Sequence, residues 1–140
     1  AVQARSLWQG LAEVLHAGGS DVTHMVRSDQ FFPDWRAVPF FHEVRRQVCG
    51  RYVAPSTSVL MPGLLHPRAA VTTDAVAVAA GGPKVEAVYP HGLDVPSTSS
   101  FAPVARAGEL VFVAGFMAAH QPGDLGGIAP EARVPDGHLW

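Results

Sequence analysis

The chain has 140 residues, of which 48% are hydrophobic and 16% are charged, and its net charge is −2. This composition is typical of a globular domain and excludes an intrinsically disordered one. Because no Lys/Arg run or stripe is present, we expect no nucleic-acid partner. No apolar run is long enough to span a bilayer and no segment resembles a signal peptide, so we expect no membrane partner and a cytoplasmic location.

The first half of the sequence predicts two helices and the strand between them. Residues Ser6–Ala17 carry apolar side chains at helical spacing and are followed by Gly18-Gly19, which is typical of a helix end. Val26–Phe32 predicts a strand, although the letters SDQ in its middle make it unusually polar. Val38–Gly50 returns to the helical period, with its proline in the first turn where it is tolerated.

The second half predicts strands and loops. Ser56–Met61 indicates a short strand, and Ala69–Ala79 is β-branched and long enough for a central strand, with Asp74 in the middle as its unusual residue. Lys84–Ser100 has the composition of a linker. The sequence then predicts a hairpin with strands Pro103–Arg106 and Glu109–Gly115, followed by a loop from His120 to Trp140. Two helices alternating with strands favour an α+β or α/β fold in which a sheet packs against both helices.

Several segments together resemble the RidA/YjgF family, whose members include imine and enamine deaminases. The stretch SSFAPVARAGELVFVAGFM is similar to the hairpin that opens a family domain. SLWQGLAEVLHAGGSDVTHMV and DWRAVPFFHEVRRQVCGRYV are similar to its two helical segments, and PSTSV and VTTDAVAVAA to its last strands. The segments stand in swapped order, because the opening hairpin comes last.

The resemblance implies a mixed sheet backed by two helices, similar to the Rid and chorismate mutase folds, in a trimer or pseudo-trimer with pockets between subunits. Residues 1–82 would be the last two-thirds of one Rid-like unit, 83–98 a linker, and 99–140 the hairpin and loop of a unit. Either a tandem fusion or a circular permutation gives this order. We expect the hairpin to pair into the sheet of Ala69–Ala79, within the chain or between chains. The expected partners are a small-molecule ligand and a second copy or a complementary Rid-like chain.

The resemblance also implies positions for a catalytic site. In the deaminases an arginine holds the substrate carboxylate and a glutamate helps to place the hydrolytic water. Thr57 stands at the arginine position and Asp74 at the glutamate position. A hydroxyl cannot form the ion pair that a guanidinium forms with a carboxylate, so we expect little activity on 2-imino acids. Asp74 is the candidate catalytic residue, because a carboxylate can orient or deprotonate water.

Further candidate residues for substrate binding follow from the same resemblance. Thr57 and Ser58 would bind the polar end of the substrate, and Gly115 falls within the motif of the second hairpin strand. Phe101 and Phe116 replace polar family positions and would wall a more apolar site. Arg36 either replaces the missing cation or is an ordinary solvated turn residue.

Other kinds of chemistry have weaker support. Asp21 with His24, and His42 with Glu43, are the nearest carboxylate–imidazole pairs, but no three residues have metal-ligand spacing, so we expect neither a metal nor a cofactor. Cys49, the single cysteine, is expected to be a small buried hydrophobe. Two functions stay open: a Rid-like hydrolase acting on a neutral or apolar substrate, and a non-catalytic Rid-like binding or scaffolding unit of a tandem protein.

Overall fold

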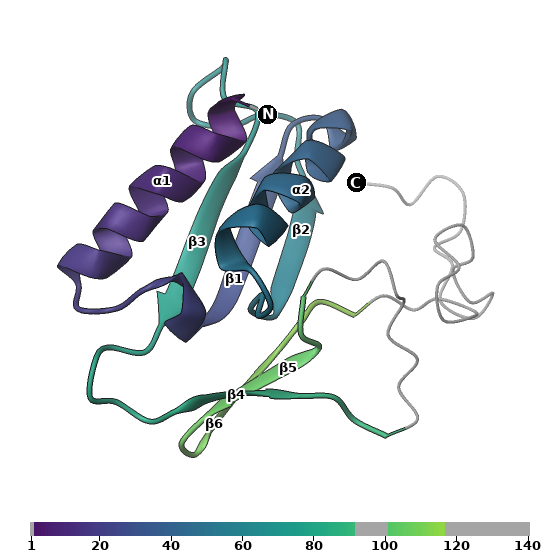
Figure 1. The fold of residues 1–140 in the computed structure, drawn as a ribbon. Helices are drawn as coiled ribbons and strands as arrows, with labels where there is room; N and C mark the ends of the chain where they lie inside the picture. Colours follow the sequence, from purple (N-terminus) through teal and green to yellow (C-terminus); the bar gives the residue numbers. More distant parts are fainter. Residues whose placement is uncertain (1, 92–100, 117–140) are drawn as a thin grey trace.

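The computed structural model describes residues 2–91 and 101–116, which form two sheets and two α-helices (Figure 1). The first sheet contains β1 (Met25–Phe32), β2 (Ser56–Leu60) and β3 (Thr72–Ala77) in the order β2-β1-β3. Strand β1 pairs in parallel with β2 and antiparallel with β3, so the sheet is mixed, as expected. Since both edges of β1 are paired, the polar strand of the sequence is the central strand of this sheet.

Both α-helices lie on one face of the first sheet (Figure 1). Helix α1 (Val2–Ala17) begins earlier than the sequence predicts, and it ends before Gly19, which has the left-handed φ of 73° that suits a glycine. Helix α2 (Val38–Cys49) carries its proline in the first turn, as predicted, and ends at Gly50. Neither α-helix among the described residues is long and apolar enough to cross a membrane.

Aromatic side chains fill the space between the helices and the sheet. Trp8 of α1, Phe32 of β1 and Phe41 of α2 are at most 1% exposed. The ring centroids of Trp8 and Phe41 are 5.7 Å apart, and those of Phe32 and Phe41 are 5.5 Å apart in an edge-to-face arrangement. Burying such a side chain contributes roughly 1.5–3 kcal/mol, so this cluster holds the helices on the sheet. Cys49 is also buried, as predicted, and burial raises the pKa of its thiol to about 11.

The second sheet contains the predicted hairpin and one strand that the sequence analysis did not predict. Its strands β4 (Val85–Val88), β5 (Val104–Ala107) and β6 (Leu110–Val113) are antiparallel in the order β4-β5-β6. Strand β4 lies inside the segment that we expected to be an irregular linker. Strand β4 has the sequence VEAV and pairs antiparallel with β5. It thereby covers a strand edge that the hairpin would otherwise leave open. The loop expected from 120 to 140 lies outside the described residues.

The hairpin does not pair with the strand of Ala69–Ala79 within this chain, so that part of our expectation is wrong. Strand β5 instead has β4 on one side and β6 on the other, and the first sheet ends at β3. The two sheets still touch through a small apolar cluster of Val26, Ala105 and Ala107. One backbone hydrogen bond also joins them, because the Gly115 N–H donates to the Ser56 carbonyl at 3.2 Å.

Candidate functional site

Alternation along β1 separates its polar side chains onto two faces of the first sheet. Ser28 and Gln30 are at most 1% exposed and lie toward the helices, where Gln30 Oε1 accepts from Arg45 of α2 at 3.4 Å. Arg27 and Asp29 alternate with them and therefore lie on the opposite face. We call the side that carries Arg27, Asp29 and their strand neighbours the open face. Candidate reactive groups must be sought there, because the helix-covered face is filled.

The open face carries a row of three polar side chains across the sheet. Asp29 of β1 is paired in register with Thr57 of β2 on one side and with Asp74 of β3 on the other. Paired residues of neighbouring strands point to the same face, and strands lie about 4.8 Å apart, so Thr57 and Asp74 flank Asp29 roughly 10 Å from each other. Asp74 is exposed and Thr57 is half-buried. Two residues that the sequence analysis selected are thus on one face with a second carboxylate between them.

Arg27 completes this constellation. Its Nε donates to Asp29 Oδ2 at 2.9 Å and its Nη2 donates to Asp29 Oδ1 at 2.9 Å, which is the two-bond geometry of an arginine–carboxylate pair. Asp29 also raises the pKa of Arg27 above its ordinary value through these bonds. The Arg27 guanidinium is therefore a cation beside Thr57. It comes from β1, whereas the resemblance implied an arginine at the position of Thr57 in β2. It is already paired with Asp29.

Residues after β6 form one border of the open face. An added Cβ at Gly115 would lie 2.8 Å from Thr57 Oγ1, so only a glycine fits this approach without a shift of one of the two. Phe116, the next residue, is 62% exposed. The structure therefore brings two of the candidate residues, Gly115 and Thr57, against each other and leaves the ring of Phe116 largely in solvent.

Ser58 and Phe101 lie on the other side of the sheet from Thr57. Ser58 Oγ donates to Gln30 Oε1 at 3.2 Å, and Phe101 packs under the guanidinium of Arg45 with 5.7 Å between its ring centroid and Cζ. Because Thr57 and Ser58 are consecutive in a strand, they point to opposite faces. Ser58 and Phe101 therefore lie on the helix-covered side of the sheet, away from Thr57 and Gly115 on the open face.

Arg36 also lies outside the open-face row. Its guanidinium is bonded to Asp34, with Nε 2.8 Å from Asp34 Oδ2, and its side chain is 80% exposed. These bonds lower the pKa of Asp34 to about 2. Within residues 2–91 and 101–116 the Arg36 side chain bonds Asp34 alone, which fits the solvated turn residue of our two alternatives.

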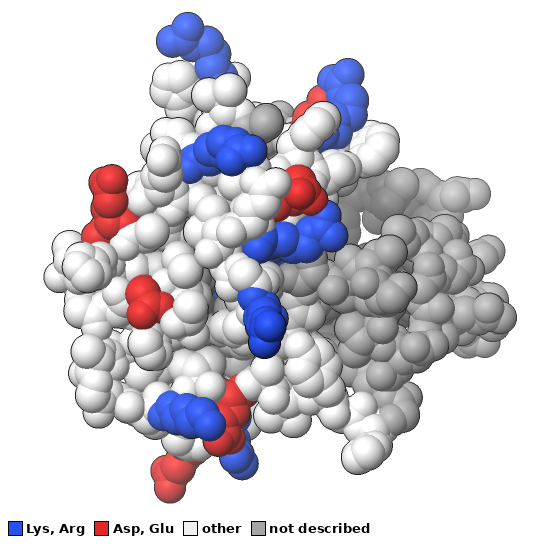
Figure 2. All heavy atoms as spheres, viewed as in Figure 1, with Lys and Arg blue, Asp and Glu red and all other residues white. Residues whose placement is uncertain are grey.

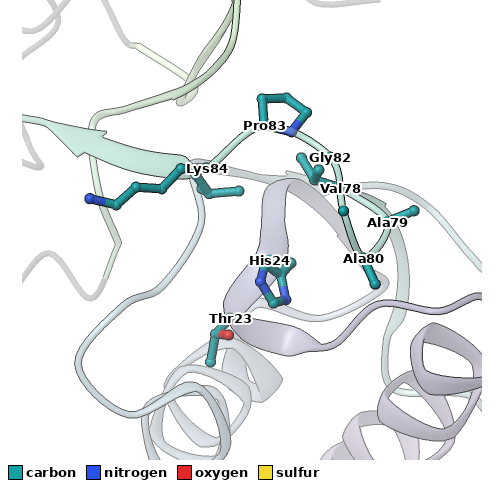
Figure 3. A pocket seen from close by; sticks show the side chains of 10 residues that line it. Thr23, His24, Val78, Ala79, Ala80, Gly82, Pro83 and Lys84 are labelled. Atoms are coloured by element: carbon teal, nitrogen blue, oxygen red, sulfur yellow. The ribbon is translucent and has the colours of Figure 1, made fainter.

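A small hollow lies elsewhere, where the start of β1 meets the connection between β3 and β4 (Figure 3). It has a volume of about 170 Å³, and Thr23, His24 and the segment from Val78 to Val85 line it. The His24 ring faces this segment and its Nδ1 lies 2.9 Å from Asp21 Oδ2. None of the candidate residues lines this hollow. Among the residues that the structure describes, no group of three or more His, Cys, Asp or Glu side chains could hold a metal ion.

Sequence reasoning missed Arg27 and Asp29 as members of the candidate site. The signal for them in the sequence is the polar interruption, SDQ, of the predicted strand Val26–Phe32. The pairing register makes Asp29 and its partner Arg27 part of the candidate site, because it places Asp29 between Thr57 and Asp74.

The comparisons with known proteins agree with this architecture. Neither a family model nor a curated protein matches the sequence. Among solved structures, yeast Mmf1 superposes with a TM-score of 0.53 at 16% identity, covering 56% of this chain and 64% of that one. RidA from an Antarctic Psychrobacter gives 0.50 at 14% identity, covering 53% and 59%. A proposed endoribonuclease from Thermotoga maritima gives 0.53 at 19% identity, covering 58% and 65%.

This chain spans less than two-thirds of the length of each of these three proteins. At such identities the likeness concerns the fold, and function has to be argued from the residues of the site. Over the part that is covered, the chain has the mixed α+β fold of the RidA/YjgF structures.

Proposed function

We propose that this chain contributes a Rid-like hydrolase site that acts on a small imine or enamine without a carboxylate group. The observation that carries the proposal is the row Thr57–Asp29–Asp74 on the open face, with Asp74 exposed at its end. In this role Asp74 orients and deprotonates the water that attacks the imine carbon, and the Thr57 hydroxyl hydrogen-bonds the polar end of the substrate.

The charges of the row favour such a substrate over a 2-imino acid. The guanidinium of Arg27 is engaged by Asp29, and Asp74 adds a second carboxylate, so the three groups together carry one net negative charge. Among residues 2–91 and 101–116, a substrate carboxylate would meet this negative charge with the Arg27 guanidinium already paired to Asp29. A neutral or protonated imine avoids that repulsion.

The test is hydrolysis of a freshly generated neutral imine by the protein as it exists, followed as ammonia release. We expect Asp74→Asn to lower the rate by about two orders of magnitude or more, which is the usual contribution of a general base. Glu86→Gln is a matched control, because Glu86 is an exposed strand carboxylate of the second sheet that pairs with Arg106. A rate that is the same in wild type and Asp74→Asn contradicts the proposal.

A second candidate function is a non-catalytic Rid-like binding or scaffolding unit. The observation that favours it is the engagement of Arg27 by Asp29, which leaves the cation of the open face saturated. In this case the chain supports a trimer or pseudo-trimer whose other units carry the reaction, as the swapped order of segments suggests for a tandem protein. Light scattering tests the assembly: we expect a mass of about three units, and a monomer of 14.8 kDa contradicts it.

Cleavage of RNA, which the name of the Thermotoga maritima structure suggests for that protein, is not the function that we propose here. On the face that Figure 2 shows, the described basic and acidic side chains are intermixed over the surface. Binding a polyphosphate backbone favours a concentrated basic surface, and the net charge of −2 is opposed to it.

A further inference from the structure

Arg27 is held by three elements of the fold. Besides the two bonds to Asp29, its Nη1 donates to the Val113 carbonyl at the end of β6 at 3.1 Å. Its Nη2 also lies 3.5 Å from Thr57 Oγ1 on β2. The guanidinium thus bridges the first sheet and the hairpin. Because the Val113 contact uses a different nitrogen, it can hold the arginine in place without the carboxylate of Asp29.

The edge of the guanidinium that faces Asp29 is the edge suited to a carboxylate ligand. The fork of Nε and Nη2 matches the two oxygens of any carboxylate, whether it belongs to a side chain or to a ligand. The side chains of Arg27 and Asp29 are 37% and 28% exposed, so the pair is accessible from solvent. An external carboxylate can reach this place only by displacing Asp29, which is tethered beside it on the same strand.

We propose that Asp29 is a specificity-determining residue that keeps carboxylate ligands off the open face by occupying the guanidinium of Arg27. When Asp29 is neutralised, the Nε–Nη2 fork becomes available and the net charge of the row rises by one unit. A small carboxylate then binds between Thr57 and Asp74. The proposal rests on the proposed function only in taking the open face as the substrate-binding face.

Binding of propanoate, measured by amide chemical-shift changes, tests the proposal without any turnover. We expect Asp29→Asn to bind propanoate roughly fivefold more tightly than wild type, with shifts centred on Arg27, Thr57 and Val113, since one exposed charge pair is worth up to about this factor. Propanamide, which has the same shape without the charge, should show no such gain. Equal propanoate affinity in wild type and Asp29→Asn overturns the proposal.

Two further variants test whether the gain in propanoate binding depends on the Arg27 guanidinium and is specific to the open face. In Asp29→Asn/Arg27→Gln the gain should disappear, and a gain that survives the loss of the guanidinium overturns the proposal. Asp34→Asn is the matched control, because Asp34 and Arg36 form the same two-residue-spaced pair on an exposed turn. We expect no new propanoate shifts at the open face in this variant. If Asp29→Asn does not fold, Asp29→Thr replaces it, since threonine is suited to a strand.

The outcome separates this inference from the proposed function. Gained propanoate binding in Asp29→Asn without imine hydrolysis in wild type supports the inference and contradicts the hydrolase. Imine hydrolysis that depends on Asp74, without gained binding, supports the hydrolase and overturns the inference.

Discussion

Two arginines on opposite faces of the same sheet illustrate what each face does. Arg45 is completely buried on the helix-covered face, where its Nη1 donates to Ser56 Oγ at 2.8 Å and its guanidinium lies over the rings of Phe41 and Phe101. Burial lowers its pKa to about 10. Arg27 on the open face is partly exposed, pairs with Asp29, and has a raised pKa.

The same residue type is held by burial and packing on one face and by a partly exposed ion pair on the other, where we propose a role in ligand selection. A buried guanidinium that bonds Gln30 and Ser56 of two strands and lies over aromatic rings fixes the packing of a helix on the sheet. A guanidinium in partial contact with water can exchange one anionic partner for another. The predictions below therefore ask whether changes on the helix-covered face affect folding while changes at the open face leave it largely intact.

The largest effect is expected from the core beneath the helices. Trp8→Ala removes a fully buried side chain between α1 and α2 and should lower the free energy of unfolding by about 3–5 kcal/mol. Val14→Ala on the same helix is the control, because Val14 is 69% exposed, and it should cost little. Denaturant unfolding measures both, and equal losses in the two variants would mean that α1 does not pack as described.

The two arginines provide the direct test of the comparison. Arg45→Met should lower the free energy of unfolding by about 1–3 kcal/mol, because the buried hydroxyl of Ser56 loses its donor and the cation–π contacts disappear. Arg27→Met should cost less than about 1 kcal/mol, as is usual for a partly exposed ion pair. A greater loss for Arg27→Met than for Arg45→Met would reverse the roles assigned to the two faces.

The pH dependence of stability reports on His42 in α2. Burial, with the nearby charges of Arg45 and Arg46, lowers the pKa of this imidazole from 6.5 to about 4. The unfolded chain therefore binds a proton at a higher pH than the folded chain, so the stability that His42 provides is complete above about pH 6.5. It is lost as the pH falls toward 4.

At pH 5 the loss should be about 1–2 kcal/mol, after allowance for the part of the ring that reaches solvent. Thermal unfolding at pH 7 and pH 5 measures it in wild type and in His42→Gln, which cannot titrate. The variant should show the smaller decrease in Tm between the two pH values. An unchanged pH dependence would assign the acid sensitivity to other groups.

A small effect is also expected where the hairpin meets the first sheet. Gly115→Ala places a Cβ against the Thr57 side chain and should cost about 1 kcal/mol, which is the low end for overpacking at a site with room to shift. In a Thr57→Ala background most of this cost should disappear, because the clashing Oγ1 and Cγ2 atoms are gone. Additive losses in the double variant would show that the two residues do not touch.

The sequence alone determined the local structure of most of the described residues. Apolar residues at helical spacing with terminal glycines specified both helices, and the hairpin followed from alternating residues around Gly108, whose φ is 60°. These features depend on neighbours along the chain, which is why they can be read without a fold. The segments that resemble those of the RidA/YjgF family also indicated the mixed α+β fold that the solved structures share. The sequence likewise selected Thr57, Asp74 and Gly115, all of which border the open face.

Only the tertiary structure decided which residues share a face. Ser58 follows Thr57 directly and Asp29 is 28 positions before it, yet the strand register places Asp29, not Ser58, beside Thr57. Arg27 reaches Val113 across 86 positions, and β4 pairs with β5 where a linker was expected. Such placements depend on strand order and on the burial of one face against the helices. These are properties of long-range pairing, so no local pattern in the sequence encodes them.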